Sequence, residues 1–143
     1  MLCMAGAGSP VCAQTRGAVI EGTLRMYYLN NEGDCDVISQ YRKADGENTY
    51  LAFVVELDKK RNVSSLLDER EREWLDDPYH SAIMIVPNFK YQPKDFAAKY
   101  ANKRVRAKGS LYVPGGGWRN ATEVVMDLKE IKRVDSIRKN GPL

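Results

Sequence analysis

The clearest hydrophobic pattern in the chain lies between residues 103 and 134. Small or apolar residues occupy every second position at first, and charged or polar residues fill the positions between them. The small or apolar set is Val105, Ala107, Gly109, Leu111 and Val113. This period of two is typical of a strand with one buried face. A glycine-rich turn and a second strand around residues 124–131 follow, so the pattern predicts a long antiparallel hairpin that closes a small barrel.

Similar patterns predict three earlier strands. The first covers residues 18–29, and Gly22 within it favours a bulge or a tight bend, as small barrels use to turn corners. Residues 30–48 are polar and rich in turn formers, which predicts a long loop. The second strand covers residues 49–58 and is apolar on both faces, so we expect something to cover its outer side. The apolar run 81–87 is the third strand.

Two short helices are expected between these strands. Residues 62–78 resemble a capped helix, with Ser65 as the cap and Asp68 near the positive helix end. Its partial apolar stripe would consist of Val63, Leu66, Leu67, Trp74 and Leu75. A second helix begins at Pro93, which suits a first helical turn, and ends near Asn102.

The order of elements predicts a mainly β fold with short helices. Five strands with a helix between the third and the fourth is the order of the OB-fold, a five-stranded, partly open Greek-key barrel. The chain has 143 residues, enough for one domain with a real core. No apolar run approaches the roughly 20 residues that span a bilayer, so no membrane span is expected.

The first residues of the chain are unusual because residues 1–14 carry no charged side chain. Val11-Cys12-Ala13 fits the small-x-small rule of a secretory cleavage site, so we expect residues 1–13 to be a signal-peptide remnant. The single domain would then be residues 14–143, exported to the periplasm or secreted. If the leader is not a signal, the protein is cytoplasmic. Without the leader, Cys35 is the only cysteine and no intrachain disulfide can form.

The C-terminal half resembles a group of small exported bacterial proteins with OB-fold-like barrels, mostly of uncharacterised function. The resemblance lies in residues 81–87, 93–100, 103–111 and 122–131, with weaker support from residues 22–24. It implies an exported binding module with this fold. Members of the group often carry a histidine-rich turn before the last strand, where this chain has Gly115 to Asn120. The departure removes the basis for a metal-binding role.

Residue types that carry chemistry are sparse. His80 is the only histidine, and its position at a strand entry favours a hydrogen-bonded or surface role over catalysis. Glu32, Asp34 and Asp36 alternate in a loop but lack the ligand order of a calcium loop. Gly115-Gly116-Gly117 precedes a strand, whereas phosphate-binding glycines precede a helix. We therefore expect a non-enzymatic protein with no metal site and no cofactor.

The sharpest candidate for binding is a row of outward residues on the fourth strand. Arg104, Arg106 and Lys108 form a basic stripe, with Tyr112 and Trp118 at its far end. Aromatic platforms beside basic residues suit single-stranded nucleic acid, and OB-folds also bind oligosaccharides. The net charge of only +3 weakens this alternative. A solvated strand face with Trp118 packed on the turn explains the same residues without a ligand.

The leading hypothesis is a binding module for a protein or envelope component. The rim of Tyr27, Tyr112, Trp118 and Arg119 would meet this partner, since aromatic residues and arginine are enriched among interface hot spots. An inhibitor or immunity-type role against a secreted toxin or enzyme fits such a domain by analogy. Steep salt dependence of oligonucleotide binding would favour the nucleic-acid alternative instead.

Overall fold

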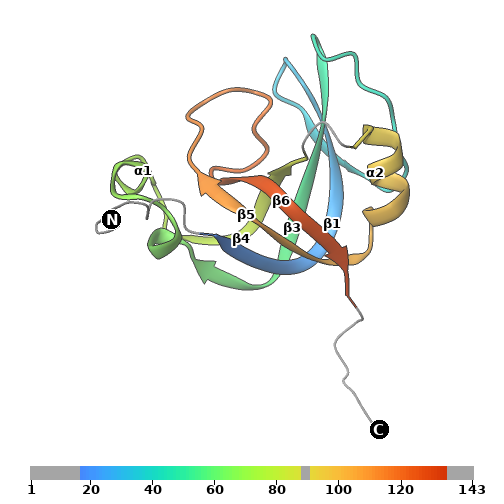
Figure 1. The fold of residues 1–143 in the computed structure, drawn as a ribbon. Coiled ribbons are helices and arrows are strands. Elements are labelled where there is room, and N and C mark those ends of the chain that lie inside the picture. Colours follow the sequence, from blue (N-terminus) through green and yellow to red (C-terminus); the bar gives the residue numbers. More distant parts are fainter. Residues whose placement is uncertain (1–16, 88–90, 135–143) are drawn as a thin grey trace, which may run out of the picture.

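Five strands close into a barrel in the computed structural model, which describes residues 17–87 and 91–134 (Figure 1). The barrel strands are β1 (Ala18–Asn30), β3 (Thr49–Asn62), β4 (Tyr79–Val86), β5 (Arg104–Tyr112) and β6 (Val125–Arg133). They follow the order β1-β3-β4-β6-β5 around the ring, and β4 and β6 run parallel. The mainly β, OB-fold-like barrel expected from the sequence is confirmed. Residues 1–13, the expected leader, lie outside the described residues.

Strand β1 closes the ring because both of its edges are paired. One edge pairs with β3 from Gly22 to Asn30, and the first half of the other edge pairs with β5 from Ala18 to Thr23. At Gly22 the neighbouring backbone comes so close that a Cβ atom would collide with the carbonyl oxygen of Glu56. Glycine at this position therefore permits the close approach by which β1 turns the barrel corner.

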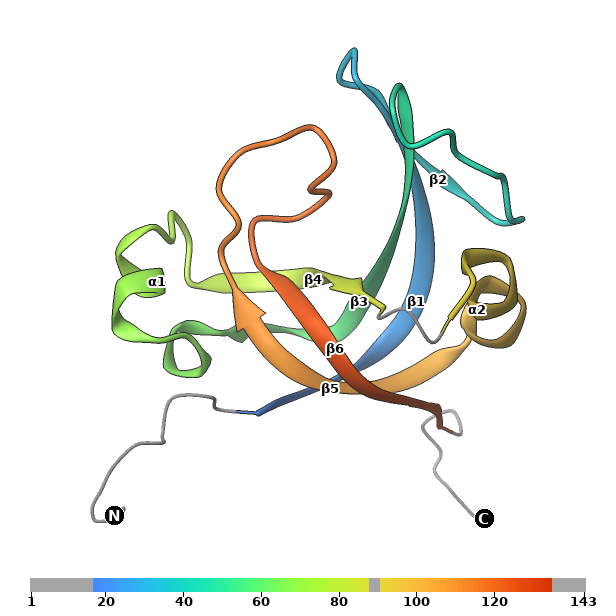
Figure 2. The same cartoon turned by 45° about the horizontal axis from the view of Figure 1, so that its top comes forward.

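Helix α2 (Pro93–Tyr100) lies between β4 and β5 in the chain and packs against one end of the barrel (Figure 2). Phe96 is buried, and its ring meets that of Phe53 edge-on with centroids 4.8 Å apart. The helix starts at Pro93 as predicted, and Asn102, two residues past its end, has a positive φ of 65°. Asparagine tolerates this left-handed conformation well, so it ends the helix.

The segment between β3 and β4 does not form the single helix expected over residues 62–78. A 3₁₀ turn, η1 (Ser64–Leu66), precedes the one-turn helix α1 (Glu69–Glu73). The cap of α1 is Asp68 and not Ser65, because the Asp68 carboxylate accepts a hydrogen bond from the Glu71 backbone amide at 2.8 Å. Val63 and Leu67 are buried, but Trp74 is 58% exposed, so the apolar residues of this segment share no stripe.

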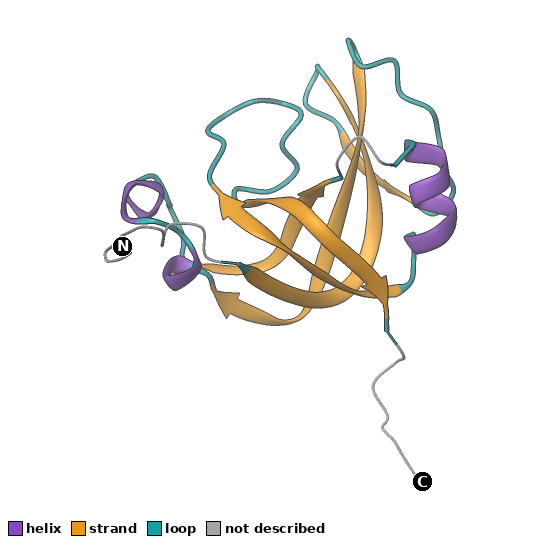
Figure 3. Cartoon of the chain, viewed as in Figure 1, coloured by secondary structure: helices purple, strands orange, loops and turns teal. Residues whose placement is uncertain are grey.

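The loop expected over residues 30–48 contains a short strand, β2 (Cys35–Ile38), which pairs with β1 at Met26–Leu29, past the stretch of β1 that pairs with β5. Its four residues are mostly exposed and alternate weakly, and this is why the sequence pattern missed it. Figure 3 shows that strands form the body of the molecule and that both α-helices lie at its periphery. No helix in residues 17–87 and 91–134 is long and apolar enough to cross a membrane.

Apolar side chains form two clusters on opposite sides of the barrel wall. The interior cluster fills the barrel and includes Leu24, Val55, Ile83, Phe96 and Met126. The exterior cluster lies on the outer face of β1, β3, β4 and β6, around Leu29, Ala52, Val54, Met84 and Val125. The sequence correctly indicated that the outer side of β3 is covered. The loop between β5 and β6, residues 113–124, supplies part of that cover through Trp118 and Ala121.

Candidate binding site

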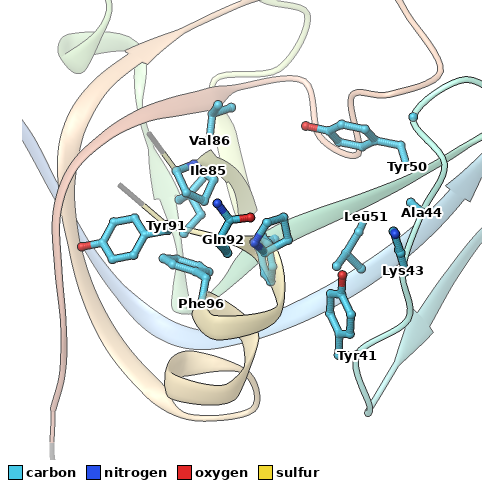
Figure 4. Close-up of a pocket in the computed structure, with 14 residues that line it drawn as sticks. Tyr41, Lys43, Ala44, Tyr50, Leu51, Ile85, Val86, Tyr91, Gln92 and Phe96 are labelled. Carbon is cyan, nitrogen blue, oxygen red and sulfur yellow. The ribbon is translucent and has the colours of Figure 1, made fainter. Parts of the chain in front are cut away.

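A cavity of about 420 Å³ opens at one end of the barrel, and we call it the mouth pocket (Figure 4). The loop before β3, the adjoining ends of β3 and β4, and the start of α2 surround it. Its lining includes five aromatic residues: Tyr41, Tyr50, Phe53, Tyr91 and Phe96. Clefts of 300–1,000 Å³ with mostly apolar walls are the usual form of a small-ligand site.

Alternation along β3 explains how the barrel core reaches this pocket. Leu51 and Phe53 belong to the interior cluster, whereas Tyr50 packs against the exterior cluster, yet all three border the pocket. Phe96 of α2 faces Phe53 at the floor, and the ring of Tyr91 meets Phe96 with centroids 5.1 Å apart. The floor is therefore a set of packed aromatic rings whose positions do not depend on a ligand.

One side of the pocket carries a positive charge. Figure 4 places Lys43 and Tyr41 on the side opposite Tyr91 and Phe96. Lys43 is the only charged residue in the lining that the structure describes. Its backbone carbonyl accepts a hydrogen bond from the Tyr28 hydroxyl at 3.0 Å, and the Arg42 guanidinium lies 4.7 Å above the Tyr28 ring. These contacts fix the backbone of the loop at Lys43, from which the lysine side chain extends.

The nearest carboxylate in the sequence, Asp45, is engaged within its own turn. It accepts hydrogen bonds from the backbone amides of Glu47, Asn48 and Thr49 at 2.8–2.9 Å. These bonds, first those from Thr49 and Asn48, lower the pKa of Asp45 to about 2. The turn is thus closed around the Oδ1 atom of an ionised carboxylate, and it holds the adjoining wall of the pocket in place.

The glycine-rich loop between β5 and β6 reaches the same wall. The Arg119 guanidinium donates a hydrogen bond to the carbonyl oxygen of Gly46, which lines the pocket. It also lies 4.3 Å from the centre of the Trp118 ring. Burial raises the pKa of Tyr50, and the nearby Arg119 charge partly opposes this rise. Arg119 and Trp118, both predicted binding residues, therefore lie beside the mouth pocket.

The aromatic residues of the predicted rim lie close together, but their side chains pack against the outer face of the barrel and are partly buried. Tyr27, Tyr112 and Trp118 all pack against the exterior cluster. The Tyr27 hydroxyl donates a hydrogen bond to Glu56 at 3.0 Å, and burial raises the pKa of both Tyr27 and Tyr112. The sequence thus identified residues that come together, and each of these rings has a packing role that is independent of a ligand.

The predicted basic stripe is a network of ion pairs. The Arg104 guanidinium makes two hydrogen bonds to Asp58, at 2.5 and 2.9 Å, and lies 3.6 Å from Glu21. Arg106 pairs with the same Glu21 carboxylate at 2.5 Å. Lys108 has no ion pair within the described part of the chain. Two of the three cations are therefore already neutralised, which weakens the stripe as a site for phosphates.

His80 is also engaged with neighbouring groups. Its Nε2 atom lies 2.6 Å from the carbonyl oxygen of Asp77 and 3.3 Å from the Glu123 carboxylate. Both neighbours are acceptors, so this nitrogen carries the proton and donates it. Among residues 17–87 and 91–134, no group of three or more His, Cys, Asp or Glu side chains could hold a metal ion.

Sequence reasoning missed the pocket residues Tyr41, Lys43, Tyr50 and Tyr91. A usable signal was present for two of them, since Tyr41 and Tyr50 lie in and just after the loop that borders the ligand groove of OB-folds. No local pattern places Tyr91 against Phe53 and Phe96, because that contact depends on how α2 docks.

Comparison of the chain with protein-family models, with curated proteins and with solved structures gave no match.

Proposed function

We propose that this protein is a non-enzymatic binding module that acts in the periplasm or after secretion on a protein or envelope partner. The partner inserts an apolar group into the mouth pocket and contacts the loops around it. The observation that carries this proposal is the pocket itself, a cavity of about 420 Å³ at the end of the barrel, whose lining includes Phe53 and Phe96 of the barrel core. Export is supported by the resemblance of the C-terminal half and by the charge-free leader sequence.

The arrangement of the pocket supports binding rather than chemistry. The described part of its lining combines aromatic and aliphatic side chains with one lysine and one glutamine, Lys43 and Gln92. A nucleophile needs a base within hydrogen-bond reach, and the lining residues in 17–87 and 91–134 contain no such pair. His80, the single histidine, donates its Nε2 proton to acceptors of its own segment and Glu123.

The partner meets a surface wider than the pocket. Arg119 joins the glycine-rich loop to Gly46, so the two loops that flank the mouth form one continuous border. Arginine and tryptophan side chains are enriched among residues that dominate binding energy. Single-stranded nucleic acid is less well supported as a ligand, because Arg104 and Arg106 are held by Asp58 and Glu21.

A pocket-filling variant tests the proposal. Ala44 lines the pocket and is half-buried, so Ala44→Trp places an indole in the opening without disturbing the core. Ala98→Trp is the matched control, because Ala98 is exposed on α2 and does not line the pocket. Each full-length protein is immobilised and exposed to an envelope extract of the source cell, and retained components are identified by mass spectrometry.

We expect the wild type and Ala98→Trp to retain the same partner and Ala44→Trp to lose it. Titration calorimetry with the purified partner should then show a loss of at least about tenfold in affinity for Ala44→Trp alone. Equal retention by both variants, with unchanged melting temperatures, would contradict the assignment of the pocket. Retention that collapses between 50 and 200 mM salt would favour nucleic acid as the ligand.

A further inference from the structure

We propose that the mouth pocket recognises the C-terminal aromatic residue of a protein partner, taking the ring on its aromatic floor and the terminal carboxylate at Lys43. This inference rests on the proposed function and specifies what the partner presents. Three properties of the pocket support it: the packed aromatic rings of its floor, the positive charge of Lys43, and its volume.

The floor of the pocket suits an aromatic ring. The Phe96 ring already meets the rings of Phe53 and Tyr91 in edge-on geometry, with centroids 4.8 and 5.1 Å apart. Aromatic pairs prefer this geometry and gain about 0.5–1.5 kcal/mol beyond the area they bury. Tyr41 and Tyr50 line the facing wall. A ring that enters the pocket therefore meets aromatic edges and faces on both sides.

The charge of the pocket suits an anion. Lys43 contributes the one charged side chain of the described lining. The Asp45 carboxylate, two residues further on, stays ionised, but it is not part of the described lining, and its Oδ1 atom accepts backbone hydrogen bonds of its own turn. The Arg119 guanidinium, which donates to the carbonyl oxygen of the lining residue Gly46, adds positive charge at the border. An incoming carboxylate consequently meets the Lys43 cation and no carboxylate among the lining residues that the structure describes.

A chain terminus supplies both features from a single residue. The pocket volume of about 420 Å³ lies at the low end of the range for small-ligand sites, which limits the group that enters. A C-terminal phenylalanine, tyrosine or tryptophan carries its ring and its carboxylate on the same Cα atom. Lys43 is exposed, so the rest of the partner chain would extend past it into solvent. There it can contact the glycine-rich loop. Capture of a C-terminal carboxylate is an established mode of peptide recognition.

A matched set of synthetic peptides tests the inference on the full-length protein. The first peptide, Gly-Ser-Gly-Ser-Phe, has a free carboxylate, and the second is the same peptide with a C-terminal amide. The third replaces the phenylalanine by alanine and keeps the free carboxylate. N-acetylphenylalanine serves as the free small acid. Affinities are measured by titration calorimetry, and the contact residues by amide chemical-shift changes in NMR.

Two protein variants separate charge recognition from general electrostatics. Lys43→Met keeps most of the side-chain stem and removes the charge, and Lys108→Met makes the same change on an exposed lysine of β5 outside the mouth pocket. We expect the free-carboxylate phenylalanine peptide to bind Lys43→Met about two- to fivefold more weakly than the wild type. A loss of this size corresponds to the contribution of a partly exposed ion pair. Lys108→Met should bind it like the wild type.

The expected pattern is that the amide peptide binds about two- to fivefold more weakly than the acid and that the alanine peptide loses at least about tenfold. Shift changes should centre on the pocket residues. Equal affinity of acid and amide, or no binding of either, overturns the inference. N-acetylphenylalanine binding as tightly as the peptide also overturns it, in favour of a small acid.

The outcome is distinguishable from a failure of the proposed function. If Ala44→Trp loses a partner from the envelope extract while neither peptide binds, the pocket is a binding site but its ligand is not a chain terminus. If Ala44→Trp retains every partner and has no effect on peptide affinity, the assignment of the pocket itself is wrong.

Discussion

The Arg119 guanidinium donates a hydrogen bond of 2.6 Å to the carbonyl oxygen of Gly46, a residue 73 positions earlier in the chain. The same guanidinium lies against the ring of Trp118, 4.3 Å from its centre. This contact joins the loop between β5 and β6 to the loop before β3. The two loops that flank the mouth of an OB-like barrel are therefore held together by one side chain.

Replacing Arg119 should loosen this junction. Arg119→Met removes the hydrogen bond and the cation–π contact, and we expect the free energy of unfolding to fall by about 1 kcal/mol. Amide hydrogen exchange should accelerate in residues 43–47 and 114–120 and remain unchanged in the barrel strands. Lys129→Met, which removes an exposed lysine paired with Asp127, is the control. Faster exchange in the control at the same loops would refute the assignment.

The two tryptophans offer a matched pair for testing the cover of the exterior cluster. Trp118 packs against that cluster, whereas Trp74 is 58% exposed. We expect Trp118→Ala to lower the free energy of unfolding by about 1–3 kcal/mol and Trp74→Ala to change it by about 0.5 kcal/mol or less. Denaturant unfolding monitored by circular dichroism measures both. Similar effects of the two substitutions would mean that Trp118 does not pack as described.

The register of β5 is tested by one inward and one outward position of the strand. Leu111 is 7% exposed in the interior cluster, and Arg106 points outward toward Glu21. Leu111→Ala should lower the free energy of unfolding by about 2–5 kcal/mol, and Arg106→Ala by about 0.5 kcal/mol, because an exposed ion pair contributes little. Equal losses in a urea titration would show that the strand register is wrong.

A comparison of two glycines tests barrel closure. A Cβ atom at Gly22 would collide with the backbone of Glu56, so Gly22→Ala requires the strands to shift and should cost about 1–3 kcal/mol. Gly116 has no atom within 4 Å of the same position, and Gly116→Ala should change the free energy of unfolding by about 0.5 kcal/mol or less. Differential scanning calorimetry of both variants gives the comparison. An unchanged melting temperature for Gly22→Ala would contradict the close approach of β1 and β3.

The turn at Asp45 makes a prediction about pH. Its pKa lies at about 2 in the folded chain, below the usual 3.8, so the unfolded chain takes up this proton first as the pH falls. The stabilisation by Asp45 is therefore present above about pH 4 and is lost between about pH 4 and pH 2. The Asp45 side-chain carbonyl signal in NMR should titrate with a midpoint near pH 2. A midpoint near 4 would show that the backbone hydrogen bonds of the turn are absent in solution.

Most of the barrel was predictable because its strands have one buried face. Val105, Ala107 and Leu111 alternate with outward residues, and Pro93 marks the start of α2, so local patterns were sufficient there. In β6 the apolar residues do not keep a strict period of two, since Leu128 and Ile131 are three residues apart. The register shift opposite Lys108 and Gly109 accounts for this spacing as a β-bulge.

The binding site was less predictable because it depends on contacts between distant segments. From the sequence, Arg104 was predicted to be a cation available to a ligand. Its ion pair with Asp58 forms only in the folded barrel, because the two residues are 46 positions apart in the chain. The same holds for the mouth pocket, where Tyr41, Phe53 and Tyr91 come from a loop, a strand and the start of a helix. The secondary-structure preference of each segment does not show which distant segments meet in the fold, so the pocket was not predicted from the sequence.

The double pairing of β1 also governs how the chain can fold. Ala18 pairs with Gly109, so the first half of one edge of β1 stays open until residues more than 80 positions later are available. Long-range pairings of this kind carry a large loop-closure cost and make folding slow. During synthesis, β1, β3 and β4 can form a three-stranded antiparallel sheet before the last two strands emerge. The barrel, and with it the covered exterior face, forms as one late step when β5 and β6 arrive together.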